Sequence, residues 1–425
     1  MLPSASRARL LGKAEYILLG CFLIALPLVE APKNVFLAAY VLTWLAGSLR
    51  QHNFGLSSRA WDALFAALLL LPLLSVVSSA PYPRVWKDLG DIASYVLLGW
   101  TLARTRVTAR QSIGLIACAV GATLIGVVHG YAVLALDAKR IWLQLNSVGH
   151  VNHSALYGAG AGMLACGLSV YARGLSARGR WLAVAAALAC FGGVVAFASR
   201  GAFVAYLFGV VVIALPCLLM QGRRFAMVAA GSLVMAALVA FAAQNLVWMV
   251  AQEKNGSSLL QKTLDNVRDN DVTSARGRLA RTAIEYWRQR PLLGLGVANF
   301  SAVSPAQVEA WVTARGEVFE PESYLFSNHA HNVYFNTLAE RGALGELLLL
   351  GLGIAWAWLL WRRRPRSGMA DVDALAWASG VAGWSVVFVG GVFNTTLHHE
   401  HGMLCLFGLA LLLGARPTAG GREPV

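Results

Sequence analysis

Residues 202–220 read AFVAYLFGVVVIALPCLLM, a run of 19 residues without a charged side chain. An apolar run of about 17–25 residues is long enough to cross a bilayer as an α-helix. The runs in this chain are continuously apolar rather than alternating, which favours helices over a membrane β-barrel. The sequence therefore predicts an all-α polytopic membrane protein with 12 transmembrane helices, centred near Leu23, Val41, Leu70, Val96, Gly121, Gly162, Ala187, Val211, Ala236, Leu352, Ala382 and Leu409.

The composition excludes other classes of protein. Hydrophobic residues make up 57% of the 425 residues and charged residues 13%, against about 45–50% and about 25% in soluble domains. So few charges cannot coat a soluble globule, and so apolar a chain does not remain disordered. The six cysteines all lie in apolar runs, so neither a disulfide framework nor a cysteine metal site is expected.

The distribution of basic residues predicts the orientation of the spans, because cytoplasmic loops carry an excess of Lys and Arg. If the N-terminus is cytoplasmic, 19 basic residues fall on cytoplasmic stretches and six on the short outer loops. We therefore predict both termini inside, with a first span that is retained rather than cleaved as a signal peptide. This topology accounts for the net charge of +14, so no nucleic-acid partner is expected.

One connection is far longer than the others. Residues 250–330 have ordinary polar composition and include a helical stretch at 274–290. A connection of this length in a compact protein is usually functional. The predicted organisation is helices 1–9 in residues 1–249, a large outer loop in residues 250–330, and helices 10–12 with a cytoplasmic tail in residues 331–425.

A histidine-rich segment joins the loop to the tenth span. It contains His329, His331 and Asn332, followed by Gly342 and Gly345. An imidazole titrates near pH 6.5 and suits a general base at neutral pH, while an Asn beside it can cap the helix or orient the ring. The two glycines are three residues apart, and we expect them to share a helical face and permit close packing. On these residues alone, a capping or interfacial histidine is as good an interpretation as a catalytic one.

Arginines at membrane boundaries are the candidate anion ligands. Arg200 lies between the seventh and eighth spans with almost no loop around it, and Arg276 and Arg278 belong to a basic cluster in the long loop. Forked guanidinium donors match the paired oxygens of a pyrophosphate. The alternatives are an interfacial marker for Arg200 and an amphipathic helix on anionic headgroups for the cluster.

Other polar residues carry weaker signals. Seven of the nine histidines are predicted on or near the outer face, and the group His398-His399-Glu400-His401 is interpreted as a polar rim of an outer site. Adjacent residues rarely close one coordination sphere, and no His-Glu-x-x-His spacing occurs, so no metal is expected. No nucleotide-binding glycine loop is present.

These motifs resemble the O-antigen ligase and polymerase superfamily. His331-Asn332, nine residues, then Gly342 and Gly345 match its His-Asn-x9-Gly-x-x-Gly pattern in full. The segment 291–300, PLLGLGVANF, is similar to a Pro-Leu-x-Gly-x-Gly stretch of the family, and Ser199-Arg200-Gly201 is similar to its arginine at a helix corner. Arg276 lies where the family has a second arginine, with Arg278 as a competing assignment.

The resemblance implies a metal-independent, inverting glycosyltransferase without a cofactor, in the inner membrane of a Gram-negative bacterium. The donor would be O-antigen linked to undecaprenyl pyrophosphate, the acceptor lipid A–core, and the site would face the periplasm among membrane lipids. His331 would be the base, Arg200 and Arg276 or Arg278 would bind the pyrophosphate, and His329 could assist. An O-antigen polymerase and a protein O-glycan ligase are the alternatives within the superfamily, and a membrane transporter is the alternative from another class.

Overall fold

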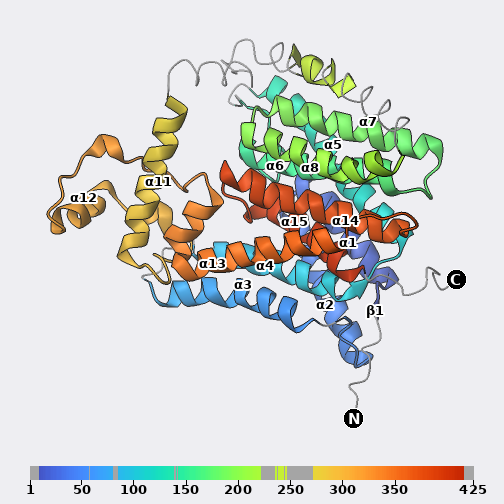
Figure 1. The fold of residues 1–425 in the computed structure, drawn as a ribbon, viewed down its shortest axis with the longest axis horizontal. Coiled ribbons are helices and arrows are strands. Elements are labelled where there is room, and N and C mark those ends of the chain that lie inside the picture. The colour runs from blue at the N-terminus through green and yellow to red at the C-terminus, as the bar shows by residue number, and fades with distance from the viewer. Residues whose placement is uncertain are drawn as a thin grey trace.

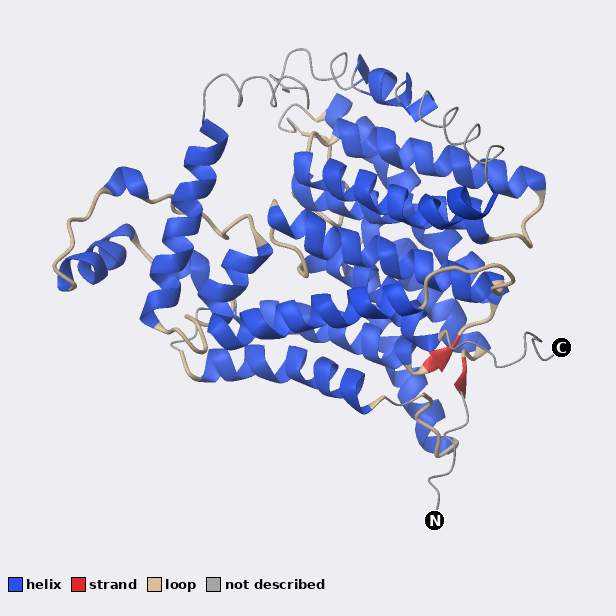
Figure 2. Cartoon of the chain, in the orientation of Figure 1, coloured by secondary structure: helices blue, strands red, loops and turns tan. Residues whose placement is uncertain are grey.

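The computed structural model describes residues 9–56, 58–79, 85–137, 140, 142–221, 235–236, 238–243, 245–246 and 271–415. These residues are mostly helical (Figures 1 and 2). The only strands among them are β1 (Arg9–Leu10) and β2 (Thr105–Arg106), which form one short parallel pair. The prediction of an all-α membrane protein is therefore confirmed in its fold class.

The helices form an elongated bundle with a smaller unit at one end (Figure 1). The bundle contains α1 (Lys13–Leu28), α2 (Glu30–Arg50), α3 (Arg59–Val77), α4 (Val85–Ala103), α5 (Ala109–Leu136), α6 (Val151–Tyr171), α7 (Ala177–Ala196), α8 (Arg200–Gln221), α13 (Val333–Arg362), α14 (Asp371–Trp384) and α15 (His399–Gly414). The smaller unit contains α11 (Asp271–Gln289), η1 (Asn299–Ala302), α12 (Pro305–Ala314) and η2 (Pro321–Ser323). A π-helical turn (Ser385–Val389) and a 3-10 turn (Gly390–Val392) continue α14.

Six helical segments of the described chain are long and apolar enough to cross a membrane: Arg59–Val77, Ala109–Leu136, Ala177–Ala196, Arg200–Met220, Val333–Arg362 and Asp371–Val392. Helices α1 and α15 are apolar but only 16 residues long. Eleven of the twelve predicted centres lie in bundle helices, and most residues around the twelfth, near Ala236, lie outside the described residues. The count of twelve spans stays a prediction.

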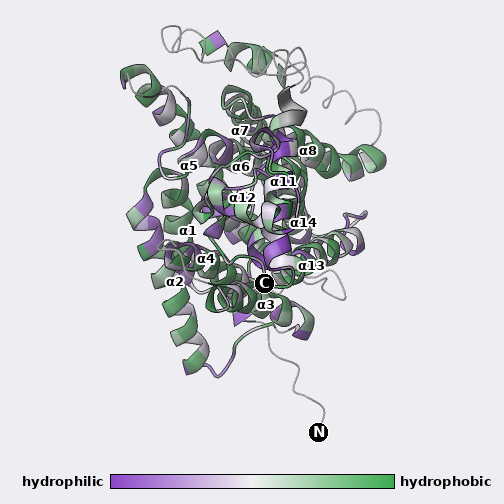
Figure 3. Ribbon diagram, turned by 90° about the vertical axis from the view of Figure 1, so that its left-hand side faces the viewer, coloured by the Kyte–Doolittle hydropathy of each residue, from purple (hydrophilic) through white to green (hydrophobic). Residues whose placement is uncertain are grey.

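Helices α6, α14 and α15 form the centre of the bundle, since nearly all of their residues are buried. Small residues allow this close packing. A side chain at Gly160 of α6 would lie 3.2 Å from Leu404 of α15, and one at Gly162 would lie 2.9 Å from Cys190 of α7. Figure 3 shows the bundle helices coloured mainly hydrophobic. This packing brings the N-terminal ends of α6 and α15 to the same end of the bundle.

The smaller unit has its own hydrophobic core. Tyr286 of α11 packs edge to face on Phe300, with ring centroids 4.9 Å apart, and Val308 and Val312 of α12 are buried beside them. The carboxylate of Glu285 accepts hydrogen bonds from both terminal nitrogens of Arg315, at 2.6 and 3.0 Å. These bonds connect α11 to the end of α12. The first part of the predicted loop, residues 250–270, lies outside the described residues.

Candidate functional site

Seven of the nine histidines meet at the end of the bundle that adjoins α11. His153 lies at the middle of the group, and its ring centroid is 5.0 Å from His401, 5.5 Å from His399, 5.8 Å from His150 and 6.1 Å from His329. We refer to this group as the histidine cluster; its members are His150, His153, His329, His331, His398, His399 and His401. The sequence predicted that these residues share one face, and the structure brings them together from three separate segments.

Three helix starts build the histidine cluster. His150 caps α6, where its Nδ1 accepts the backbone N–H of Asn152 at 3.3 Å, and His153 lies in the first turn. His398 caps α15. His331 directly precedes Asn332, the N-cap of α13. The predicted capping role of Asn332 is confirmed, because its Oδ1 accepts the backbone N–H groups of the first turn of α13 at 2.9 and 3.0 Å.

Several imidazole nitrogens in the cluster are buried and make no hydrogen bond with the described residues. These are Nδ1 of His153, Nδ1 of His398, and both ring nitrogens of His401. Buried polar atoms are usually paired, and an exception calls for a functional or structural reason. Among the ion pairs of the described chain, one joins the cluster to a carboxylate. His399 Nδ1 lies 3.5 Å from Asp91 Oδ2.

His331 is half-buried and its backbone is strained. Its φ angle of 50° lies in the left-handed region, which is unfavourable for a residue with a Cβ atom. Burial first, and then the charges of His150 and Arg276, lower the pKa of the His331 imidazole below its ordinary value. The ring is therefore neutral at neutral pH and has a lone pair that can accept a proton.

His329 lies beside His331, with ring centroids 4.2 Å apart. Burial and the neighbouring imidazoles of His331, His150 and His399 lower the pKa of His329 to about 3. This imidazole is also neutral at neutral pH. Its position agrees with a supporting role, since it contacts the ring of His331 and also reaches His153.

The two candidate arginines of α11 have different partners. Arg278 donates from Nε and Nη2 to the carbonyl oxygen of Tyr324, at 3.2 and 2.8 Å, so it holds the smaller unit together. Arg276 instead lies over the ring of Phe393, 5.1 Å from its centroid. Burial first, and then the charge of Arg200, lower the pKa of the Arg276 guanidinium. The charge of Arg276 therefore acts on His331, and that of Arg200 acts on Arg276.

Arg200 begins α8 at a tight corner after α7. Ala198 has a φ of 52°, and the next helix starts two residues later, so the predicted near absence of a loop is confirmed. Gly201 lies directly on Phe393, because a Cβ atom there would be 2.5 Å from the Phe393 Cβ. Arg200 and Arg276 therefore come from distant parts of the chain to the neighbourhood of one aromatic ring.

The family described as O-antigen ligase matches residues 185–350. This range contains Arg200, Arg276 and His331. This match supports membership of the O-antigen ligase superfamily. A comparison with curated proteins gave no match. Membership implies a ligase or polymerase of the glycosyltransferase type, with polysaccharide and lipid substrates.

The O-antigen ligase match covers only part of the site. It ends at residue 350 and begins at residue 185, so His150, His153 and the His398–His401 segment lie outside it. His153 of α6 packs on His329, and His398 and His401 at the start of α15 pack on His153. The histidine cluster thus joins residues of the matched region to residues of the rest of the chain.

The prediction that Gly342 and Gly345 share one helical face is wrong. Gly342 has φ 64° and ψ −165°, which interrupts α13. The 291–296 segment fills the break: Leu295 and Gly296 donate to the carbonyls of Ala339 and Glu340 at 2.9 Å. A Cβ atom at Gly342 would collide with the backbone of Leu292. The two family-like motifs therefore form one backbone unit, which sets the direction of the helix start that carries His331.

Two residues of His398–His401, the segment interpreted from the sequence as a polar rim of an outer site, are buried. Glu400 and His401 are 4% and 1% exposed. Glu400 forms a buried ion pair with Lys33, which also donates to Ser147 Oγ at 3.1 Å. Sequence reasoning counted Lys33 only among the basic residues of the short outer loops and did not identify this buried partner.

Arg341 is a further residue that sequence reasoning missed. Burial and the neighbouring imidazoles lower the pKa of His398 well below its ordinary value, and the charge of Arg341 adds to this effect. The Nε atom of Arg341 is buried and makes no hydrogen bond within the described chain. Within the described ranges, no group of three or more His, Cys, Asp or Glu residues is arranged to hold a metal ion.

Proposed function

We propose that this protein transfers O-antigen polysaccharide from undecaprenyl pyrophosphate to lipid A–core, at the periplasmic face of the inner membrane. The observation that carries the proposal is that Arg276 lies over the ring of Phe393, on which Gly201 next to Arg200 packs, inside the region that matches the O-antigen ligase family. The charge of Arg276 also lowers the pKa of His331. Transfer of a glycan from a lipid diphosphate requires a base for the acceptor and positive charge for the diphosphate, and His331, Arg200 and Arg276 supply both.

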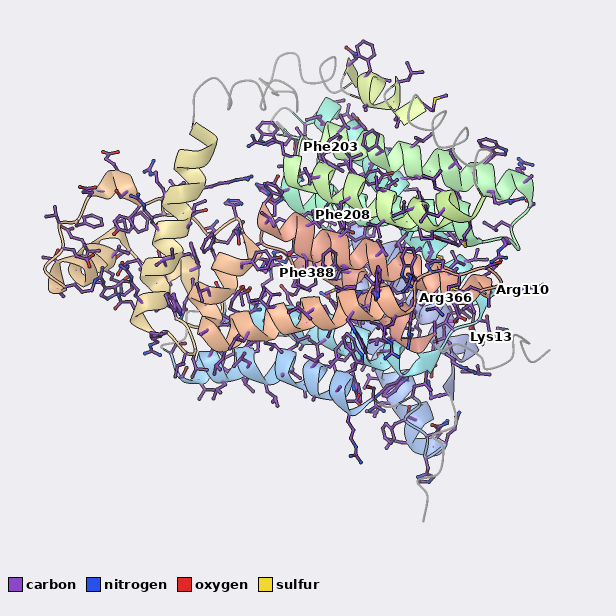
Figure 4. All side chains as sticks on the ribbon, in the orientation of Figure 1. Lys13, Arg110, Phe203, Phe208, Arg366 and Phe388 are labelled. Atoms are coloured by element: carbon purple, nitrogen blue, oxygen red, sulfur yellow. The ribbon has the colours of Figure 1, made fainter. Side chains whose placement is uncertain are left out.

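The proposed topology has twelve spans with both termini in the cytoplasm. Figure 4 supports it, because Lys13, Arg110 and Arg366 lie together at the end of the bundle away from α11 and α12. These residues belong to stretches that the excess of Lys and Arg assigns to the cytoplasm. The histidine cluster then faces the periplasm, where the polysaccharide donor and the lipid A–core acceptor would be available.

Arg200 and Arg276 bind the pyrophosphate of the donor in this proposal. The mutual repulsion of the two guanidinium groups is relieved when a diphosphate lies between them, and planar fork-shaped donors match its oxygens. Arg278 is not part of this pair in the proposal, since its Nε and Nη2 donate to the carbonyl oxygen of Tyr324. The same charges stabilise the undecaprenyl pyrophosphate that departs.

His331 acts as the general base. Its neutral ring accepts the proton of an acceptor sugar hydroxyl while the hydroxyl oxygen attacks the anomeric carbon of the donor. The bond between that carbon and the pyrophosphate oxygen breaks, and the pyrophosphate keeps the electron pair. Attack from the face opposite the leaving group inverts the configuration. The two arginines supply the positive charge that the leaving group needs, so the proposed transfer is metal-independent.

Deletion of the gene, followed by electrophoresis of the lipopolysaccharide, tests the function. Loss of a ligase leaves bare core while polymer accumulates on the lipid carrier. Loss of a polymerase leaves core capped with one repeat unit, and that result would replace ligation with polymerisation. His331→Ala should not restore the polymer ladder, whereas His129→Ala, which changes an exposed histidine outside the cluster, should restore it fully.

A further inference from the structure

A cavity of about 900 Å³ lies at the other end of the bundle, between α6, α7, α8 and residues 365–369. Helices α6 and α8 begin at the candidate functional site, and the ends that line this cavity are their C-terminal ends. The walls are mainly apolar and include Val184, Leu188, Phe191, Leu207, Val211 and Leu215. A cavity of this size and character is typical of a ligand site.

Three arginines surround the mouth of the cavity, and no acidic residue of the described chain lines it. Arg173 is held in place by Asp371, at 3.0 Å, and by the carbonyl oxygen of Met369, at 2.8 Å. Arg180 and Arg366 are exposed and have no carboxylate partner in the described chain. Figure 4 shows Arg366 at this end of the bundle. The mouth is therefore positively charged while the interior is apolar.

We infer that this cavity binds one anionic glycerophospholipid of the cytoplasmic leaflet, with its phosphate at Arg180 and Arg366 and an acyl chain along α7 and α8. Basic pockets between transmembrane helices on the cytoplasmic side are suited to anionic headgroups. A soluble anion would leave the apolar walls uncovered, and an uncharged lipid would leave the two guanidinium groups without a partner. The amphiphilic ligand satisfies both parts of the cavity.

Binding here would stabilise the helices that reach the functional site. Tyr171 of α6 donates to the carbonyl oxygen of Ile213 at 2.7 Å, and Tyr206 of α8 donates to that of Ala187 at 3.0 Å. These hydrogen bonds join α6, α7 and α8 around the cavity. A bound lipid therefore raises the thermal stability of the protein without contact with the histidine cluster.

The test measures lipid retained by the delipidated full-length protein in detergent, by native mass spectrometry, with phosphatidylglycerol and phosphatidylcholine as probes. We expect phosphatidylglycerol to bind more tightly and to raise Tm. Each of Arg180→Gln and Arg366→Gln should weaken its binding about fivefold, the loss expected for one cation at an anionic lipid. Ala214→Phe, which fills the cavity, should weaken the binding of both lipids.

Arg178→Gln and Arg364→Gln are the matched controls, since these exposed arginines lie in the same two segments but do not line the cavity. They should change binding less than twofold. Three results would each overturn the inference: equal retention of both lipids, retention of neither, or equal losses in the control variants and the cavity variants. The charge variants leave the packing unchanged, so the inference stays testable if Ala214→Phe fails to fold. None of these outcomes depends on the transferase function.

Discussion

The two ends of the bundle are both rich in positive charge, yet they are built differently. At one end, Arg200 and Arg276 lie with the histidine cluster, in which the described residues leave ring nitrogens of His153, His398 and His401 buried without a hydrogen bond. At the other end, Arg180 and Arg366 surround an apolar cavity without a histidine. Both ends can attract an anionic lipid, but only the first also offers a neutral base.

This difference separates binding from chemistry. A guanidinium group holds a phosphate at any physiological pH because it stays protonated. An imidazole can exchange a proton near neutral pH. We therefore expect changes at the histidine end to reduce transfer, and changes at the cavity end to alter lipid binding and stability.

The largest expected effect is that of His331→Ala. General-base assistance contributes about 10²–10⁴ in rate, so transfer by the purified variant should fall by that factor in a single-turnover assay with lipid-linked donor. His329→Ala should reduce the rate much less, because its ring supports His331 rather than contacting the acceptor. Equal losses in the two variants would remove the distinction between base and support.

Lys33→Met should destabilise the fold at the histidine end. It leaves Glu400 buried without its partner, and removal of one member of a buried ion pair costs about 3–5 kcal/mol. The loss should appear as a lower Tm, and the double change Lys33→Met with Glu400→Gln should recover part of it. Lys13→Met, at an exposed position, is the control and should stay within about 0.5 kcal/mol of the wild type. A Lys33→Met protein as stable as wild type would contradict the buried pair.

Arg276→Gln should weaken use of the lipid donor. A hydrogen bond to a charged group is worth about 1.5–3 kcal/mol, which corresponds to roughly a tenfold to hundredfold loss in kcat/KM for the donor. Arg278→Gln should lower Tm instead, since it removes the bonds to Tyr324. If Arg278→Gln reduced donor use more than Arg276→Gln did, the assignment of the second pyrophosphate ligand would be reversed.

The smallest effect on transfer is expected at the other end of the bundle. Arg180→Gln and Arg366→Gln should change the transfer rate less than twofold at fixed temperature, while they weaken binding of phosphatidylglycerol. A steady-state assay in detergent with saturating donor checks this. A loss as large as that of Arg276→Gln would show that the two ends are not independent.

Local features of the sequence predicted much of this structure. Continuous apolar runs give helices because backbone groups in a bilayer must pair within the segment, and the capping by Asn332 depends on the next three residues only. The convergence of the histidine cluster was predicted only as a shared face, because it requires α6 and α15 to pack side by side. The break at Gly342 escaped prediction because its cause is the distant 291–296 segment rather than the neighbouring residues of the chain.

The choice between Arg276 and Arg278 shows the same limit. Side chains two residues apart on a helix point in directions that differ by about 200°, so only one of these two arginines can face the site. Helical periodicity does not say which one. The packing of α11 against the Tyr324 segment favours Arg276 for the proposed role, since that segment binds Arg278 and leaves Arg276 beside Phe393.

The pH dependence of kcat/KM tests most directly whether His331 and Arg276 act in one site. Burial, His150 and Arg276 lower the pKa of His331, so the acid limb of the wild-type profile should lie below pH 6.5. Arg276→Gln removes a positive charge near the ring and should move the acid limb to higher pH, while Arg278→Gln should leave it in place. An acid limb that stays fixed in Arg276→Gln, or moves equally in both variants, would contradict the account.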